Sequence, residues 1–197
     1  MESPTHYIEA TILPLDGFTP SRGDIAFATS AIMNSVHLRI VEGAELSVSF
    51  PQMNTADGEI TTGTIVRVFG SPVDLAKLLG DQKFASFHAG GMFRLGRESI
   101  RAVPHTSNWE VYKRDRSRER GFTGFRAREA RYVERNPDAK WRLDRPKERH
   151  EKMAFIHMRS ASTGGRRFSL FIRKAIVEGF VVGKPNTYGM GVPVPAF

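Results

Sequence analysis

The chain has no cysteine, and this absence removes two kinds of site. Disulfide bonds and thiolate-bound metal centres both need cysteine sulfur, so neither is available to these 197 residues. Long apolar runs are missing too, since no segment approaches the roughly 20 residues that span a bilayer. The opening residues Met1–His6 lack the basic and apolar regions of a signal peptide. We therefore expect a soluble, cytoplasmic protein with no membrane partner.

Acidic residues are outnumbered by basic ones, 21 to 29, and the formal net charge is +8. Residues 109–152 hold 15 Lys and Arg against 9 Asp and Glu, so this segment carries +6 of that charge. Positive charge concentrated in one segment is typical of a protein that binds a polyanion. The alternative is a solvated charged helix, which the interspersed acidic residues leave open.

The first half of the chain alternates between strand and helix patterns. A helix is expected from Ser21 to about Glu42, because apolar residues recur there at helical spacing and Gly43 follows. Around it we expect strands over residues 6–15, 46–50, 59–69 and 91–103, and a second helix over 73–79. The order β-α-β-β-α-β is that of the ferredoxin-like unit. We predict an α+β protein whose residues 1–104 form a ferredoxin-like domain.

Residues 105–197 are predicted to form a second domain, with a basic helical segment followed by a β-hairpin-rich region. A helix from Phe125 to Arg135 would place Arg128, Arg131 and Arg135 on one stripe. Such a stripe can lie along a nucleic-acid groove and pair with phosphates through its guanidinium groups. The alternative is an exposed helix held by ion pairs such as that of Arg131 with Glu134.

Residues 154–173 read as two strands joined by a turn of small and basic residues. Alternation on the second strand puts Phe168, Leu170 and Ile172 on one side. The turn offers hydroxyl groups, bare backbone and guanidinium groups, beginning at Ser160 and including Ser162, Arg166 and Arg167. Together with an aromatic ring, these groups can hold a phosphodiester backbone and a stacked base. An ordinary surface hairpin is the other reading.

Three pieces of this region, in this order, resemble one family. They are Arg159-Ser-Ala-Ser-Thr-Gly164, Phe168-Ser-Leu-Phe-Ile-Arg173, and Tyr188-Gly-Met with the closing Val192-Pro-Val-Pro-Ala-Phe197. The chain is similar here to the CRISPR repeat-processing endoribonucleases of subtype I-F. The resemblance implies an enzyme without cofactor or metal that cleaves precursor CRISPR RNA at the 3′ side of its repeat hairpin. It further implies that the protein stays on the mature crRNA beside other subunits of a surveillance complex.

The resemblance also assigns roles to four residues. In this family the catalytic histidine lies late on the first helix, before a Val-Ser-Phe-Pro strand, and here His37 precedes Val48–Pro51 by a gap about two residues shorter. His37 is thus implied to be the base that deprotonates the ribose 2′-hydroxyl, a task that suits histidine. Ser160 is implied to constrain that ribose, Tyr188 to place the histidine, and Phe168 to stack on the base pair that closes the hairpin. The turn before Phe168 is one residue longer than the family's.

The resemblance also implies that residues 111–116 recognise the bases of the RNA, because they are similar to the family's linker that enters the major groove of the hairpin. The family uses an arginine and a glutamine there, and this chain has Arg114 and Arg116. Arginine prefers the O6 and N7 edge of guanine, so we predict two consecutive guanines, or one guanine and a phosphate, near the hairpin base. Arg118 is expected among the RNA contacts as well.

Two other classes of function stay open at this point. A structural subunit that binds the RNA hairpin without cutting it would use the same basic segment and the same aromatic residue. A DNA-binding regulator is less compatible with the sequence, which has no helix-turn-helix pattern and no zinc-ligand spacing. Replacing His37 separates the first class from a nuclease, because only cleavage needs its imidazole.

Overall fold

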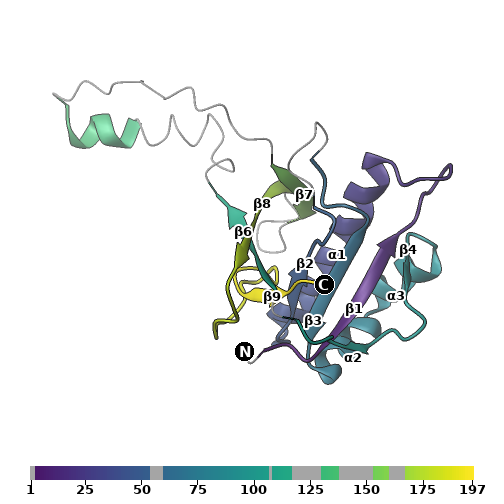
Figure 1. Cartoon of the computed structure of the whole chain (residues 1–197). Helices are drawn as coiled ribbons and strands as arrows, with labels where there is room; N and C mark the ends of the chain where they lie inside the picture. The colour runs from purple at the N-terminus through teal and green to yellow at the C-terminus, as the bar shows by residue number, and fades with distance from the viewer. Residues whose placement is uncertain (1–2, 54–59, 107, 117–129, 138–152, 160–166) are drawn as a thin grey trace.

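The computed structural model describes residues 3–53, 60–106, 108–116, 130–137, 153–159 and 167–197. Two antiparallel sheets lie beside each other, with helices packed against them (Figure 1). The first sheet has the order β2-β3-β1-β4, and β5 also pairs with β1. Its strands are β1 (His6–Ile12), β2 (Ser47–Ser49), β3 (Ile65–Gly70), β4 (Phe93–Leu95) and β5 (Arg101–Ala102). The α+β class predicted from the sequence is confirmed.

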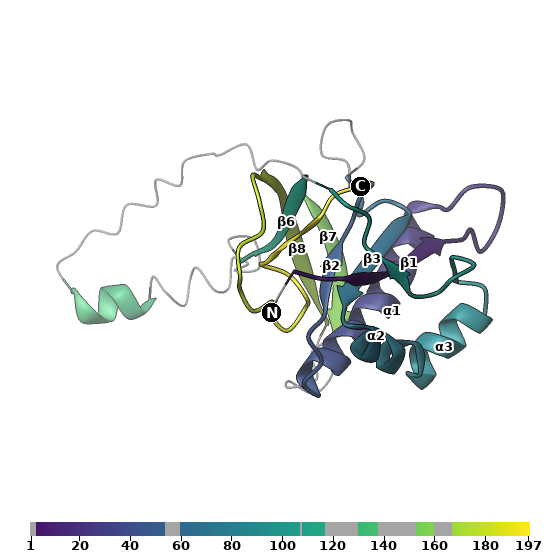
Figure 2. The same ribbon diagram turned by 60° about the horizontal axis from the view of Figure 1, so that its bottom comes forward.

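Alternation along β1 decides which face of the first sheet is buried. Ile8, Ala10 and Ile12 are buried, and across the ladder Ile8 and Ala10 meet Val68 and Val66 of β3. Three helices cover this face: α1 (Arg22–Val41), α2 (Pro72–Leu79) and α3 (Gln82–Ala89), which gather on one side of β1 and β3 in Figure 2. The apolar side chains of strands and helices therefore share one core.

Each helix begins at a side chain that satisfies its first backbone N–H groups. Ser21 and Asp24 form a reciprocal capping box at α1, in which each side chain accepts a hydrogen bond from the other residue's backbone N–H. Ser71 caps α2 and Asp81 caps α3 in the same position. Helix α3 was not expected from the sequence, although Asp81 before the run of residues 82–89 is an ordinary start signal.

Two expected strands are shorter than the alternation predicted. The strand expected over 59–69 begins only at Ile65. Just before it, the side-chain oxygen of Gln52 accepts hydrogen bonds from both the N–H and the hydroxyl of Thr64. Gly63 has φ +77°, and a Cβ at that position would lie 2.5 Å from the Cβ of Gln52. The strand expected over 91–103 is two short strands, β4 and β5, that pair with different parts of β1.

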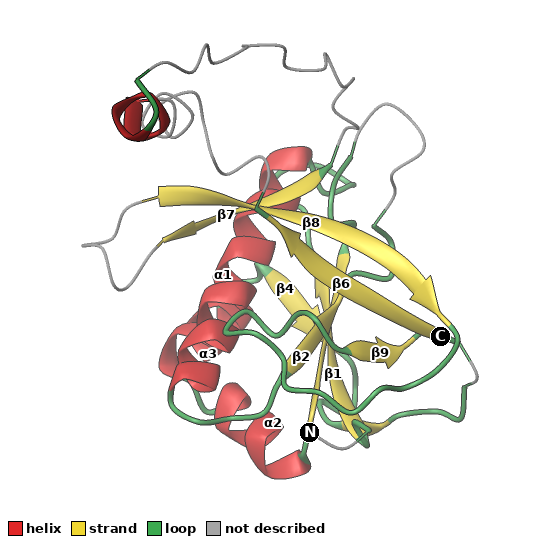
Figure 3. Cartoon of the chain, turned by 90° about the vertical axis from the view of Figure 1, so that its left-hand side faces the viewer, coloured by secondary structure: helices red, strands yellow, loops and turns green. Residues whose placement is uncertain are grey.

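The second sheet is built from the C-terminal half and has the order β7-β8-β6-β9. Figure 3 shows β8 running along the whole sheet, with β7 on one side and β6 on the other. Its strands are β6 (Trp109–Asp115), β7 (Ala154–Arg159), β8 (Arg167–Val177) and β9 (Pro193–Pro195). The expected hairpin is present as β7 and β8, with His157 opposite Ser169. Residues 109–116 were expected to be a short extended piece, and the segment 111–116 within it resembles the family's linker. In the structure Trp109–Asp115 is an inner strand of the sheet, and its pairing with β8 reaches Val177.

Helix α1 contacts both sheets and so links the two halves of the molecule. Ile32 and Val36 are buried in a cluster that also contains Ile156 and Leu170 of the second sheet. The hydroxyl of Ser30 donates a hydrogen bond to the backbone carbonyl of His157 on the edge strand β7. Among the described residues, no helix is long and apolar enough to cross a bilayer.

Candidate active site

His37 lies near the end of α1, one residue after the buried Val36, and its side chain is half-buried. Its Nδ1 is 2.7 Å from the backbone carbonyl oxygen of Thr187. A carbonyl oxygen can only accept a hydrogen bond, so Nδ1 carries the hydrogen. In the neutral ring the other nitrogen, Nε2, then has a free lone pair. This geometry therefore makes Nε2 the nitrogen that can accept a proton.

Tyr188 and Phe168 extend this imidazole into a row of rings. The ring of Tyr188 stacks on His37 with 4.8 Å between centroids and an angle of 18° between planes. Phe168, on β8, meets Tyr188 edge-on at 6.1 Å and 62°. The guanidinium carbon of Arg114, on β6, lies 5.3 Å from the centroid of each of these two rings. Helix α1, strands β6 and β8 and the turn that carries Tyr188 thus bring one imidazole, two aromatic rings and one guanidinium together.

The turn over residues 186–190 positions both groups that touch His37. The side-chain oxygen of Asn186 accepts hydrogen bonds from the N–H of Tyr188, at 2.9 Å, and of Met190, at 3.2 Å. The backbone of Asn186 closes the same turn, since its N–H donates to the Met190 carbonyl and its carbonyl accepts from Gly189. Between these bonds, the carbonyl of Thr187 faces His37 and the ring of Tyr188 stacks on it.

Strands β2 and β6 hold this turn in place. The N–H of Val48 donates to the carbonyl of Gly189 at 2.9 Å, and the N–H of Gly191 donates to the carbonyl of Tyr112 at 2.9 Å. Gly189 has φ +73°, and a Cβ there would lie 3.2 Å from the Val48 side chain and 3.3 Å from the carbonyl oxygen of Leu46. Glycine is therefore required both for the backbone angle and for the close approach of the two segments.

Tyr112 anchors β6 behind the turn. Its ring is buried against Phe50 at 5.5 Å, and its hydroxyl donates to the carboxylate of Glu110 at 2.6 Å. Burial raises the pKa of Tyr112 far above its ordinary value, and the neighbouring Glu110 raises it further. Lys174 of β8 pairs with the same carboxylate at 2.6 Å. The phenol therefore stays neutral and serves as a hydrogen-bond donor in the interior.

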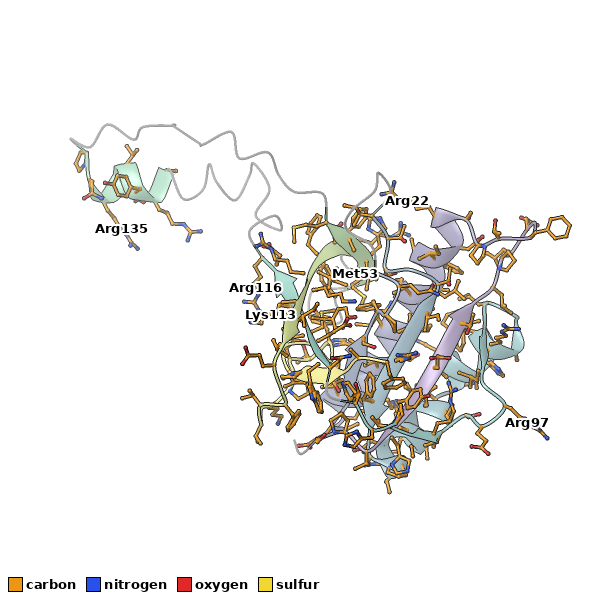
Figure 4. The ribbon with its side chains drawn as sticks, in the orientation of Figure 1. Arg22, Met53, Arg97, Lys113, Arg116 and Arg135 are labelled. Atoms are coloured by element: carbon orange, nitrogen blue, oxygen red, sulfur yellow. The ribbon has the colours of Figure 1, made fainter. Side chains whose placement is uncertain are left out.

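The remaining basic residues predicted to bind RNA divide into two groups. Arg116 lies just beyond β6 and is exposed, close to Lys113 in Figure 4, and Arg167 is exposed at the start of β8. Arg131 and Arg135 are exposed on a short helix over residues 130–135 and lie one turn apart on its surface. The other predicted site residues lie outside the described residues: Arg118, Arg128, Ser160, Ser162 and Arg166.

The structure places four of the predicted site residues side by side: His37, Tyr188, Phe168 and Arg114. Two further partners of this cluster were not singled out from the sequence. The Thr187 carbonyl is a backbone group and leaves no mark in the sequence. Asn186 stood in a recognisable turn signal, Pro185-Asn-Thr-Tyr-Gly, whose asparagine and glycine both favour turns.

Asp115 pairs with Arg173 at 2.5 Å. Within the described ranges, no group of three or more His, Asp or Glu side chains is arranged to hold a metal ion.

Comparison with known proteins identifies a family that matches this chain. A family model described as CRISPR-associated protein (Cas_Csy4) matches residues 7–197, nearly the whole chain. A solved structure named "CRISPR associated protein Cas6" aligns over 100% of both chains, at 14% sequence identity and a TM-score of 0.33. That likeness is too distant to locate any residue. No curated protein matches the chain.

Proposed function

Because the chain belongs to the Cas_Csy4 family, the CRISPR repeat-processing endoribonucleases of subtype I-F, we propose that it cuts precursor CRISPR RNA with His37 as the general base. Nε2 of His37 takes the proton of a ribose 2′-hydroxyl, and the 2′-oxygen attacks the adjacent phosphorus. The bond from phosphorus to the 5′-oxygen breaks, and that oxygen leaves as a hydroxyl after gaining a proton. The products are a 2′,3′-cyclic phosphate and a 5′-hydroxyl, and no step requires a metal ion.

The observation that carries this proposal is the hydrogen bond from Nδ1 of His37 to the Thr187 carbonyl, at 2.7 Å. It holds the hydrogen on Nδ1 and leaves Nε2 as the proton acceptor. The stacked Tyr188 ring adds a second restraint on the orientation of the imidazole. A histidine held in one tautomer and one orientation is suited to proton transfer, because catalysis depends on alignment of the reacting atoms.

Phe168 and Arg114 are proposed to receive the base of the RNA hairpin. The Phe168 ring would stack on the closing base pair, and Arg114, whose guanidinium lies over two rings, would read a guanine edge. Ser160 would constrain the ribose that supplies the nucleophile. The other proposed RNA contacts are Arg116, Arg118, Arg128, Arg131, Arg135, Ser162, Arg166 and Arg167.

We further propose that the protein stays on the mature crRNA and works within a larger crRNA complex. We also retain the division into residues 1–104 and 105–197, the first a ferredoxin-like unit. The strand order β2-β3-β1-β4, with every neighbour antiparallel and helices on one face, supports that assignment. Helix α3 and strand β5 are additions to the unit.

The test is single-turnover cleavage of a repeat transcript in EDTA, with the product ends mapped. His37→Ala is expected to abolish cleavage and to leave hairpin affinity within a few-fold of the wild type. His105→Ala, at an exposed histidine outside this site, is the matched control and should cleave normally. Loss of wild-type cleavage in EDTA would reject the mechanism. Hairpin binding without cleavage by the wild type would favour the non-catalytic subunit instead.

A further inference from the structure

A second surface on the same strands is not used by the site around His37. It is the outer face of the second sheet, defined here by Phe155 and His157 of β7, Phe171 of β8 and Lys113 of β6. Strand alternation turns these side chains away from the core, whereas their neighbours Ile156, Leu170 and Ile172 are buried. Figure 3 looks toward the second sheet, which lies in front of α1 in that view.

Three aromatic rings form a continuous cluster on this face. The Phe155 ring lies 5.1 Å from the ring of His157, edge-on at 73°, and 5.6 Å from the ring of Phe171, tilted at 48°. His157 is exposed, and the two phenylalanine side chains are half-exposed. Aromatic rings at the surface of a sheet are not needed for the core, and each offers a π-face on which a nucleic-acid base can stack.

Positive charges flank the rings. Lys113 and Arg173 lie side by side across β6 and β8, and both are exposed, the Arg173 side chain at 62%. Arg167 is exposed near the other end of the cluster. Of the described side chains on this face of the three strands, Asp115 is the acidic one, and it is buried and paired with Arg173. The face therefore combines stacking surfaces with a net positive charge, as single-strand binding platforms do.

We propose that this outer face binds an unpaired segment of the repeat RNA next to the hairpin. The inference rests on the proposed function and extends it to the flank of the same substrate. The two surfaces occupy opposite faces of shared strands: Arg114 and Phe168 face the His37 site, and Lys113 and Phe171 face outward. Bases would stack on Phe155, His157 and Phe171, and phosphates would meet Lys113 and Arg167. The net positive charge beside the rings, which includes Lys113, favours RNA over a protein partner, because the cores of protein interfaces are depleted of charged residues and of lysine in particular.

The experiment compares the full chain's affinity for two RNAs, the bare hairpin and the hairpin with a single-stranded flank. Both carry a 2′-deoxy sugar at the mapped cleavage position, so neither is cut. The flank is expected to tighten wild-type binding by about 10-fold, the effect of a single stacked base. Phe155→Leu with Phe171→Leu keeps the apolar volume and removes the rings, and His157→Ala changes an exposed residue. Phe18→Leu is the matched control, at a fully exposed phenylalanine on the loop before α1.

The ring variants should lose the contribution of the flank while their affinity for the bare hairpin stays at the wild-type level. Their cleavage of a separate hairpin that keeps the 2′-hydroxyl at the cleavage position should also stay at the wild-type level. The control should keep that contribution. The proposal is overturned if the flank adds nothing in the wild type, as expected if this face binds a protein. It is also overturned if a flank of abasic sugars binds equally well, or if His157→Ala keeps the full contribution. Failure of the wild type to bind the bare hairpin at all would instead reject the proposed function.

Discussion

Asn186→Ala tests whether the turn over residues 186–190 positions His37, the proposed general base. The substitution removes the side-chain oxygen that accepts hydrogen bonds from the N–H groups of Tyr188 and Met190. The residue is exposed and does not contact His37 directly. The expected consequence is a turn that no longer holds the Thr187 carbonyl and the Tyr188 ring in their places against the imidazole.

The magnitude follows from the two lost hydrogen bonds. Each contributes about 0.5–1.5 kcal/mol, so the positioned form of the turn is weakened by about 1–3 kcal/mol. If cleavage occurs only in that form, the rate falls by about 5- to 140-fold, because 1.4 kcal/mol corresponds to about a tenfold change. Hairpin affinity should change little, since Phe168 and the basic residues lie on other elements.

The assay is single-turnover cleavage alongside hairpin binding, with Asn186→Asp as the conservative variant. A carboxylate oxygen can accept the same two hydrogen bonds, so this variant should recover most of the rate. Nitrogen-15 NMR of the neutral imidazole should also show hydrogen on Nδ1 of His37 in the wild type. Cleavage by Asn186→Ala within twofold of the wild type would show that the Asn186 side chain does not position His37. Cleavage by Asn186→Asp as slow as that by Asn186→Ala would show the same. A wild-type ring with its hydrogen on Nε2 would also refute the reasoning.

Three further predictions concern the supports of the site and the fold. Gly189→Ala forces a residue with a side chain into the left-handed conformation beside Val48. The free energy of unfolding in urea should therefore fall by about 1–2 kcal/mol, and cleavage should slow. An unchanged urea midpoint would contradict this prediction. Arg114→Lys keeps the positive charge but removes the planar guanidinium that lies over the Phe168 ring. The affinity for the hairpin should therefore fall by about 2- to 30-fold in filter binding. Equal affinity would show that stacking of Arg114 on Phe168 does not contribute to binding. Burial alone would raise the pKa of Glu9, but its two arginine partners lower the pKa below the ordinary glutamate value. The ionised Glu9 therefore contributes fully to stability above the ordinary pKa of glutamate, and this contribution is lost as the pH falls through the lowered pKa. The melting temperature of Glu9→Gln should fall less steeply with decreasing pH than that of the wild type.

The sequence determined the local elements of this protein. The apolar spacing predicted a helix from Ser21, within a residue of the observed start of α1 at Arg22, since this spacing is a property of neighbouring residues. The alternation along residues 154–173 predicted the hairpin of β7 and β8 and put Leu170 and Ile172 on one side of the second strand. The structure shows that these two side chains are buried. The motifs near the C-terminus were sufficient to indicate the family, because they lie close together in the chain.

The tertiary structure alone decided what each element touches. Alternation shows which residues of a strand share a side, but it does not show that Gln52 accepts two hydrogen bonds from Thr64 or that residues 109–115 are an inner strand. His37 meets a carbonyl 150 positions later in the chain, and that carbonyl has no side chain by which to be recognised. Hydrogen bonds to backbone atoms across long separations depend on the packing of α1 and β2 against the C-terminal turn. The fold therefore decided which imidazole nitrogen of His37 carries the hydrogen, whereas the sequence alone supplied the histidine.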